Sequence, residues 1–373
     1  MKKVVVIGAG ILGTSTAYHL SKRGAKVTLI DRQEAGQATR AAAGIICPWL
    51  SQRRNKTWYR LARNGARYYE SLIAELAHEG EHHTGYAKVG ALCLHQDLDK
   101  LKAMQQRAEK RKEEAPEIGD ITLITNQQAK ELYPFLSEDY NVLHVSGAAR
   151  VDGRALTEAM RNVAVRYGAS YIVGDAKLQY CDCTITGVVV NDETIDADDV
   201  IVCAGAWSNE LLHPLGVNVH VGYQKAQIIH LKAEEGKETG KWPVIMPPND
   251  QYLLSFDKQK VVVGATHEDD VIGYDLSPTV RGMHDIMHKG LQAAAGIAQC
   301  AFEEVKVGFR PKTANFLPVF GRVNEWSNLF VANGLGSSGL TAGPYVGLQL
   351  AKQILNEELE LPIEEYAPSL AGK

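Results

Sequence analysis

The sequence has little cysteine and lacks any long apolar run. Its six cysteines lie scattered between Cys47 and Cys300, without the density of a secreted disulfide scaffold, so we expect reduced thiols. No apolar run approaches the roughly 20 residues of a membrane-spanning helix. The apolar start at residues 4–7 is short, is followed by glycines and has no cleavage site, which excludes a signal peptide. We expect a soluble, cytoplasmic protein without a transmembrane segment.

The sequence also lacks an excess of positive charge. The 40 basic and 44 acidic residues leave a net charge of −4, which argues against a nucleic-acid partner. Hydrophobic residues make up 45% and charged residues 23%, as in an ordinary globular protein. The 373 residues are about two and a half times the ~150 residues of a typical domain, so two domains or one large one are expected.

Metal and nucleophile motifs are sparse. Cys181 and Cys183 stand one residue apart with no second pair at zinc-site spacing. Cys203 falls in an apolar run, where a thiol serves as a small core residue. His82 and His83 lack the arrangement of a zinc protease. We therefore expect no metal site and assign none of these residues a catalytic role.

The first 31 residues have the pattern of a β-α-β unit. Residues 4–7 are a continuous run of Val and Ile, typical of a strand buried on both faces of a parallel sheet. Residues 11–23 have near-helical apolar spacing and end at Gly24, a residue suited to cap a helix. Residues 27–30 predict the second strand, which ends at Asp31.

A glycine fingerprint lies at the turn between the first strand and the helix. Gly8, Gly10 and Gly13 match the dinucleotide-binding pattern, in which the glycines allow a tight turn, close approach of a pyrophosphate and close helix packing. A bare match would occur by chance roughly 0.3 times in this chain, but here the structural context agrees. Asp31 follows at the distance of the carboxylate that accepts ribose hydroxyls. That carboxylate disfavours NADP and leaves FAD or NAD.

A second glycine cluster lies near the end of the chain. Gly334, Gly336 and Gly339 stand between a predicted strand at residues 329–332 and a helix at residues 340–355. The tail beyond has no strand pattern with which to complete a second dinucleotide fold. This helix is therefore expected to direct its positive end at another part of the same cofactor. The alternative is a glycine turn that serves only packing.

The rest of the chain predicts a region rich in helices and, after it, a region rich in short strands. Helices are expected at residues 58–76, 98–114 and 156–167, of which 98–114 is so rich in Lys, Arg and Glu that we expect a solvated face. A buried strand is expected at residues 199–204. After Pro214 short strands dominate, at residues 227–231, 252–256, 261–265 and 305–309, with a helix from Ser277 and Pro278 to residue 298. We infer a nucleotide-binding domain built from separated segments, with a second domain inserted.

Several motifs together resemble the FAD-dependent amine oxidoreductases of the D-amino-acid oxidase and glycine oxidase type. The similarity covers most of the chain and is more specific than either glycine pattern alone. Besides the two glycine clusters, the matching segments are residues 38–44, 202–207, 264–266 and 308–311.

This resemblance implies an α/β fold in two parts. A split Rossmann-like FAD-binding domain would comprise residues 1–85, 140–215 and 312–373. An inserted α+β substrate domain, built on a mostly antiparallel sheet, would comprise residues 86–139 and 216–311. The cysteine that tethers flavin in monomeric sarcosine oxidases is missing near Arg310, so we expect noncovalent FAD.

The resemblance also implies the residues that hold FAD. By matching position, the cofactor-binding residues are Gly8, Gly10, Ile11, Leu12 and Gly13 at the pyrophosphate, Asp31 and Arg32 at the adenosine ribose, Ala38, Thr39, Ala43, Gly44 and Ile45 along the flavin, Ala176 at the adenine, Gly205, and Leu335, Gly336, Ser337, Ser338, Gly339, Leu340 and Thr341 at the pyrimidine end.

Three residues are expected to face the substrate. The resemblance assigns Arg310 and Tyr252 to its carboxylate, and a guanidinium suits this role because it offers paired donors and keeps its charge when desolvated. His267 matches a substrate-facing position, with a solvated histidine as the alternative. The alternatives are a surface-turn arginine for Arg310 and a core aromatic for Tyr252. Some relatives carry a second arginine in the closing loop, where this chain has Ser337.

The resulting hypothesis is an FAD enzyme that oxidises the C–N bond of glycine, sarcosine, a D-amino acid or a related amine. Hydride would pass to flavin N5, the imine would hydrolyse, and O2 or another acceptor would reoxidise the flavin. The loop at residues 45–54, with Arg53 and Arg54, is expected to shape the pocket and favour an acidic or bulky substrate. An NAD-linked dehydrogenase, a flavin-binding module without turnover, and a homo-oligomer stay open.

Overall fold

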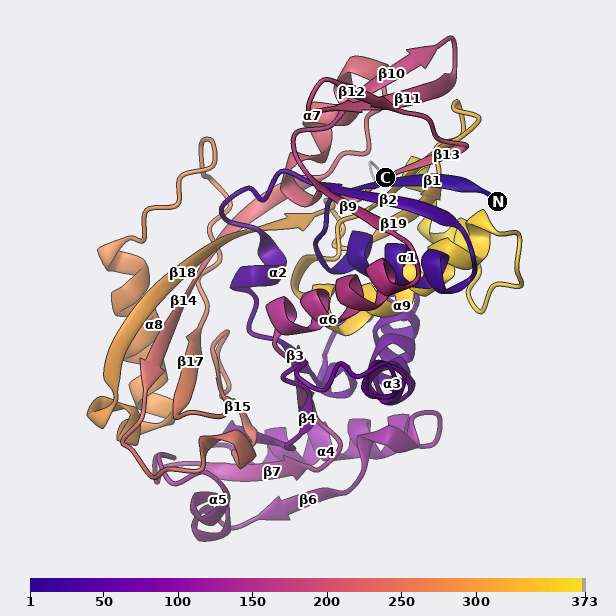
Figure 1. Ribbon diagram of the computed structural model, residues 1–373. Coiled ribbons are helices and arrows are strands. Elements are labelled where there is room, and N and C mark those ends of the chain that lie inside the picture. The colour runs from indigo at the N-terminus through magenta and orange to yellow at the C-terminus, as the bar shows by residue number, and fades with distance from the viewer. Residues whose placement is uncertain (371–373) are drawn as a thin grey trace.

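A computed structural model describes residues 1–370, and its upper part is a six-stranded sheet (Figure 1). The strand order is β19-β20-β13-β1-β2-β9, parallel throughout except that β19 runs antiparallel to β20. The strands are β1 (Lys3–Ile7), β2 (Lys26–Asp31), β9 (Ser170–Val173), β13 (Asp199–Val202), β19 (Val319–Arg322) and β20 (Leu329–Asn333). The predicted β-α-β unit is confirmed, because α1 (Ile11–Lys22) joins β1 to β2.

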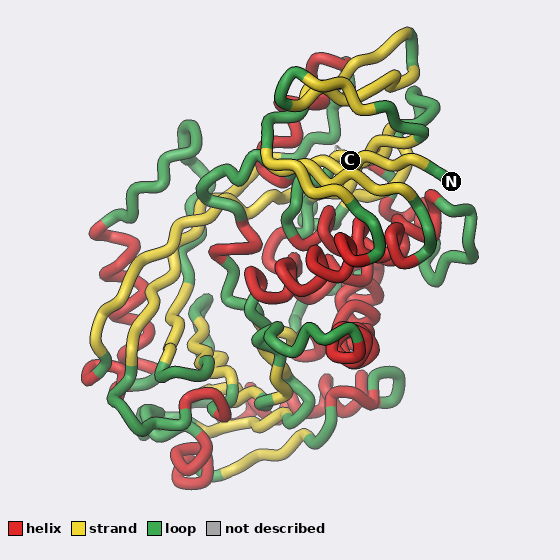
Figure 2. The backbone as a smooth tube through the Cα atoms, in the orientation of Figure 1, coloured by secondary structure: helices red, strands yellow, loops and turns green. Residues whose placement is uncertain are grey.

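Helices cover one face of this sheet and a small sheet covers the other (Figure 2). The helices are α1, α6 (Gly153–Arg166) and α9 (Gly339–Ile354), with α3 (Lys56–His78) packed against α9. The small sheet consists of β10 (Lys177–Cys181), β11 (Thr184–Val190) and β12 (Glu193–Ile195). Both faces are thus buried, as the continuous apolar character of these strands predicted.

The part of α9 from Leu340 to Gly347 is fixed by contacts that suit its sequence. Pro344 lies inside the helix and provides no N–H for the carbonyl of Leu340, a defect that costs about 3 kcal/mol in an isolated helix. The buried hydroxyl of Tyr69 donates to that carbonyl instead, so the acceptor keeps a partner. Gly347 lets α1 approach, since a Cβ there would lie 2.4 Å from the Ser15 Oγ. These contacts hold the amino-terminal end of α9 in place.

The second large sheet has eight strands in the order β18-β14-β17-β16-β15-β5-β7-β6. All neighbours are antiparallel except β15 and β5, so the mostly antiparallel sheet is confirmed. Its two longest strands, β14 and β18, reach up to the parallel sheet, and α8 covers the outer face (Figure 1). The elements are β5 (Ala91–His95), β6 (Ile121–Ile124), β7 (Asn141–Val145), β14 (Gly222–Lys232), β15 (Val244–Met246), β16 (Tyr252–Ser255), β17 (Lys260–Gly264), β18 (Ala301–Lys312) and α8 (Val280–Ala293).

Short elements connect the two large sheets. A three-stranded sheet of order β3-β8-β4 lies between them. The remaining elements are β3 (Ile45–Ile46), β4 (Ala87–Lys88), β8 (Ala149–Arg150), α2 (Ala38–Ala41), α4 (Leu98–Lys112), α5 (Asn126–Leu132) and α7 (Ser208–Leu212). All six cysteines are unpaired. Within residues 1–370, the helices are all too short or too polar to cross a bilayer.

Two predictions need correction. The helix predicted from residue 277 to residue 298 begins at Val280, because the Thr279 side chain, rather than that of Ser277, accepts from the Gly282 N–H and caps it. It ends at Ala293 and a short 3₁₀ turn follows. The strand predicted at residues 305–309 is the middle of the much longer β18. The proposed domain boundaries stay a prediction, and β7, which was placed in the 140–215 segment, pairs within the eight-stranded sheet.

Candidate functional site

A single cavity of about 1180 Å³ runs between the carboxyl ends of the parallel strands and the inner face of the eight-stranded sheet. It exceeds the roughly 300–1,000 Å³ of most small-ligand sites and has room for a dinucleotide together with a small substrate. Gly10 and Gly339 both line it, so the opening and closing glycine clusters meet at one site. Of the residues predicted from the sequence, all line the cavity except Gly13 and His267.

The opening glycine turn (residues 8–13) admits no larger side chain at two positions. Gly8 has a φ of 103°, and a Cβ there would lie 2.4 Å from the carbonyl oxygen of Cys203. A Cβ on Gly13 would lie 1.8 Å from the carbonyl oxygen of Gly8. Gly13 therefore acts beneath the turn, where it lets α1 approach β1. The amino-terminal end of α1, with its partial positive charge, consequently opens onto the cavity.

Asp31 is a firmly held carboxylate at the end of β2. It accepts hydrogen bonds from the backbone N–H groups of Ala9 and Gln33, both at 2.6 Å, and from Gln37 Nε2 at 2.9 Å. Its side chain is buried and lines the cavity. A fixed carboxylate at this strand end suits the hydroxyls of an adenosine ribose.

The neighbouring Arg32 is neutralised by acidic side chains. Its guanidinium lies 2.9 Å from Glu34, 3.3 Å from Asp175 and 2.8 Å from Glu210. All three acidic residues line the cavity together with Asp31, and we call these four residues the acidic end. An extra phosphate on the ribose would meet net negative charge here, which agrees with the prediction against NADP.

The closing loop (residues 334–341) is tied to both sides of the cavity. Trp58 Nε1 donates to Ser338 Oγ at 3.0 Å, and Thr341 Oγ1 donates to the Ile45 carbonyl at 3.1 Å. Gly44 has a φ of 92°, and a Cβ there would lie 1.8 Å from the Val151 carbonyl oxygen. A glycine at this position therefore lets the chain around Gly44 approach the end of β8. The loop is thus held opposite the segment predicted to lie along the flavin.

The residues present fit FAD. Two helices, α1 and α9, begin at one cavity, so that one positive end faces the pyrophosphate position and the other the flavin position. Burial raises the pKa of Cys47 and Cys203 to about 12 and that of Cys93 well above its usual value. These cavity-lining thiols therefore stay protonated and unreactive, in line with the prediction of noncovalent binding.

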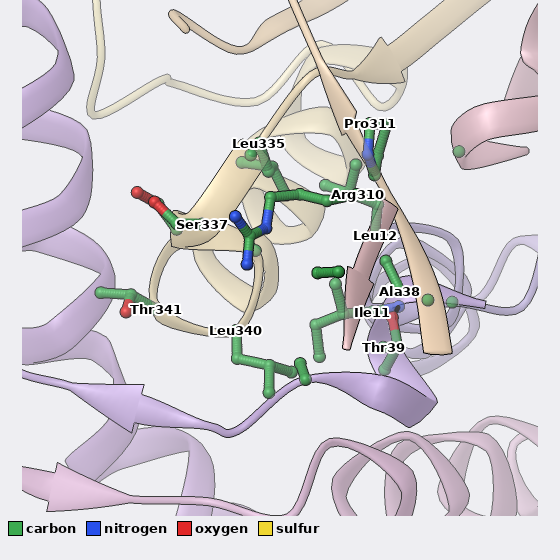
Figure 3. Close-up of a pocket in the computed structure, with 18 of the residues that line it drawn as sticks. Ile11, Leu12, Ala38, Thr39, Arg310, Pro311, Leu335, Ser337, Leu340 and Thr341 are labelled. Atoms are coloured by element: carbon green, nitrogen blue, oxygen red, sulfur yellow. Dashed lines mark hydrogen bonds between the residues drawn. The ribbon is translucent and has the colours of Figure 1, made fainter. Parts of the chain in front are cut away.

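Arg310 lies on β18 and not on a surface turn. The neighbouring Phe309 N–H donates to the Gly36 carbonyl at 2.9 Å, and Gly308 packs so closely that a Cβ would lie 2.6 Å from that of Ala41. This end of β18 is thereby fixed beside the flavin segment. The Arg310 side chain extends from the strand towards the closing loop that carries Ser337 (Figure 3). Its hydrogen-bond acceptor within the described chain is Gln224 Oε1, at 2.9 Å.

Tyr252 lies on β16, across the sheet from Arg310, and lines the same cavity. Its hydroxyl lies over Gly264, where a Cβ would approach it to 2.7 Å. Burial raises the pKa of Tyr252 to about 12, against an opposing effect of Arg310, so the hydroxyl stays a neutral donor. Burial also lowers the pKa of Arg310, and Tyr252 and Asp269 oppose this effect. An arginine pKa starts so high that the guanidinium keeps its charge.

His267 does not line the cavity. Its side chain is 38% exposed and its Nδ1 lies 3.9 Å from Asp250 Oδ2. Burial and the nearby Arg310 charge lower its pKa. The position favours the alternative of a partly solvated histidine beside acidic residues.

One wall of the cavity was not predicted from the sequence. Lys100, Met104 and Arg107 of α4 line it, although this helix was predicted to be a solvated surface. Their spacing of four and three residues places them on one helix face. The spacing was visible in the sequence, but the many charges nearby concealed it.

Comparisons with known proteins identify the family of the chain. The family model described as FAD dependent oxidoreductase matches residues 3–353. The chain is 53% identical over 369 residues to the oxidoreductase YurR of Bacillus subtilis strain 168, covering 99% of each protein. It is 43% identical to the crystal structure of iminodiacetate oxidase from Chelativorans sp. BNC1, with a TM-score of 0.94 and 98% of both chains covered. Glycine oxidase from Geobacillus kaustophilus, at 21% identity and a TM-score of 0.83 over 98% of both chains, shares the fold. The chain therefore belongs to the family of FAD dependent oxidoreductases.

Proposed function

We propose that this FAD-dependent oxidoreductase oxidises the C–N bond of a small amino acid or amine that carries a carboxylate. The observation that carries the proposal is the placement of Arg310 and Tyr252 in the cavity that the glycine clusters enclose. The similar iminodiacetate oxidase and the glycine oxidases that share the fold are named for carboxylated amines, which supports the same substrate class here.

Arg310 would bind the substrate carboxylate through paired N–H donors. The acidic side chains among the described lining residues are the four of the acidic end. None of them is paired with Arg310, so the substrate carboxylate would act as the counter-charge of its guanidinium. Gln224 orients the guanidinium and is itself oriented, because its Nε2 donates to Asp269 Oδ1 at 3.1 Å. Tyr252 would add one neutral hydroxyl donor.

When bound, FAD supplies the two-electron acceptor for this oxidation. The substrate C–N bond loses two electrons and two protons in all, and the resulting imine is hydrolysed by water. The protein's own contribution is to fix the carboxylate, and with it the orientation of the C–N bond, which is a large part of catalysis when the cofactor carries the chemistry. Reoxidation by O2 or by another acceptor completes the cycle.

Anaerobic reduction of the bound flavin tests the proposal. Glycine, N-methylglycine, iminodiacetate and several D-amino acids would each be mixed with the holoenzyme while the flavin band near about 450 nm is followed. Methylamine and dimethylamine serve as matched controls without a carboxylate. We expect bleaching by at least one carboxylated amine and none by the controls, followed by an assay for peroxide on admission of air. Failure of the whole panel, or equal bleaching by the controls, would contradict the proposal.

A further inference from the structure

Several basic side chains besides Arg310 line the cavity. Arg53 stacks on the rings of Trp58 and Phe316, with its guanidinium carbon 4.8 and 5.5 Å from the two ring centroids. Trp58 is bonded to the closing loop, and the Phe316 ring also lies under Lys312, two residues beyond Arg310. Arg53 therefore sits beside both the closing loop and the end of β18. It lines the cavity together with Lys100, Arg107 and Arg310, and we call these four residues the cationic end.

Within residues 1–370, the guanidinium groups of Arg53 and Arg107 have no hydrogen bond or ion pair with an acceptor of the chain. The Nε of Arg107 is buried without a partner. By contrast, Arg63 and Arg67, which face the region beyond α4, pair with Glu114 and Glu117. A buried guanidinium donor without an acceptor is costly, so the missing acceptor points to a ligand.

The two arginines line the same two cavities, and hydrogen bonds tie the loop that carries Arg53 to α4. Both line the main cavity and also an adjoining small pocket that contains Arg111. Arg111 is already used, because it donates to the carbonyls of Trp49 and Ser51 and so holds the loop that carries Arg53 against α4. The Arg53 N–H in turn donates to Ser51 Oγ at 3.2 Å. Arg53 and Arg107 thus present donors without acceptors in the described chain, from a loop tied to α4 and from α4 itself.

We propose that Arg53 and Arg107 form a second anion subsite, which binds a carboxylate at the far end of the substrate. Arg310 and Tyr252 would hold one carboxylate and the arginine pair the other, with the amine between them at the flavin. The substrate class is then a small secondary amine with a carboxylate on each side of the nitrogen. This inference rests on the proposed function and adds to it a specificity that Arg310 alone does not provide.

The test compares two redox-inert ligands that differ in one carboxylate. Thiodiacetate carries two carboxylates and (methylthio)acetate carries one, and neither has an amine to oxidise. Each would be titrated into the FAD-loaded enzyme by calorimetry, for the unmodified protein and for Arg53→Gln, Arg107→Gln and the double variant. Arg54→Gln is the matched control, because Arg54 is exposed and lines the small pocket but not the main cavity.

We expect the unmodified protein to bind thiodiacetate about 10- to 100-fold more tightly than (methylthio)acetate. Each single variant should lose most of that preference, the double variant all of it, and the control none. Arg53→Lys, which keeps the charge, should retain part of it and so guards against an effect of misfolding. The ratio of kcat/KM for iminodiacetate and N-methylglycine should fall in parallel.

Two results would overturn the subsite. One is equal affinity of the unmodified protein for both ligands, and the other is an unchanged preference in the double variant that still holds FAD. If N-methylglycine bleaches the flavin while the preference is absent, the subsite fails and the proposed function stands. If no carboxylated amine bleaches the flavin while the preference for thiodiacetate is present, the proposed function fails and the anion subsite stands.

Discussion

The two ends of the cavity differ in charge and in how that charge is satisfied. At the acidic end, Asp31 accepts three hydrogen bonds from the chain, and Arg32 pairs with three carboxylates. At the cationic end, Arg310 has one acceptor in Gln224, and Arg53 and Arg107 have none within the described chain. At the first end Asp31 and Arg32 have their partners within the chain, whereas at the second end Arg53 and Arg107 have no acceptor in the described chain.

This difference would orient both ligands that we propose for the site. Hydroxyl groups of an adenosine ribose can donate to the fixed carboxylate of Asp31, while a carboxylated substrate is repelled there and attracted to the other end. The cationic end and the positive amino-terminal end of α9 also suit the negative charge that a flavin gains on reduction. On our proposal, the polarity of the cavity would set the direction of FAD and the place of the substrate.

The largest expected effect comes from breaking the opening turn. In Gly13→Ala the new Cβ would lie 1.8 Å from the Gly8 carbonyl oxygen, so α1 and the turn cannot keep their places. We expect the variant to purify without flavin, as measured by the ratio of visible to protein absorbance. Gly222→Ala, whose Cβ meets nothing within 4 Å, is the control and should stay yellow. A yellow, fully active Gly13→Ala enzyme would refute the assignment of this turn.

Removing the central charge of the cationic end should have the next largest effect. Arg310→Ala should lower kcat/KM for carboxylated amines by about 100- to 1,000-fold, because a desolvated carboxylate loses its charged partner. The flavin spectrum and FAD content should not change, since Arg310 makes its hydrogen bond to Gln224 and not to the glycine turns. Equal activity in the variant would remove Arg310 from the substrate site.

A smaller loss should follow from removing the neutral donor of the same end. Tyr252→Phe should reduce kcat/KM by about tenfold, the effect of one hydrogen bond to a charged group. Burial raises the pKa of Tyr252 from 10.0 to about 12, so the hydroxyl keeps its proton as pH rises and is lost as a donor only near the raised value. The kcat/KM profile should therefore show no fall due to Tyr252 between about pH 8 and about pH 11. A descending limb near pH 10 that is absent in Tyr252→Phe would contradict this.

The smallest effect is expected at His267. Because its side chain is partly exposed and does not line the cavity, His267→Ala should change kcat/KM by no more than about twofold. Steady-state kinetics alongside Arg310→Ala makes the comparison direct. A loss as large as that of Arg310→Ala would contradict this expectation and indicate that the substrate binds beside His267.

The glycine turns that line the cavity were easier to predict from the sequence than the wall that α4 contributes. The opening turn is local, so a few glycines between a strand and a helix suffice to identify it. The closing loop could be linked to it because the sequence pattern of residues 356–373 predicts no strand with which to complete a second nucleotide fold. Arg107 could not be placed this way, because α4 carries many charges and only tertiary packing decides which of them faces inward. The start of α8 was missed because Ser277 and Thr279 are both good caps.

The most direct test of the account is a crystal structure of the protein with FAD and thiodiacetate. It should place the adenosine ribose at Asp31, the flavin between Ile45 and the closing loop, and one ligand carboxylate on Arg310 and Tyr252. A flavin ring lying at Asp31, or a ligand carboxylate held away from Arg310, would contradict it.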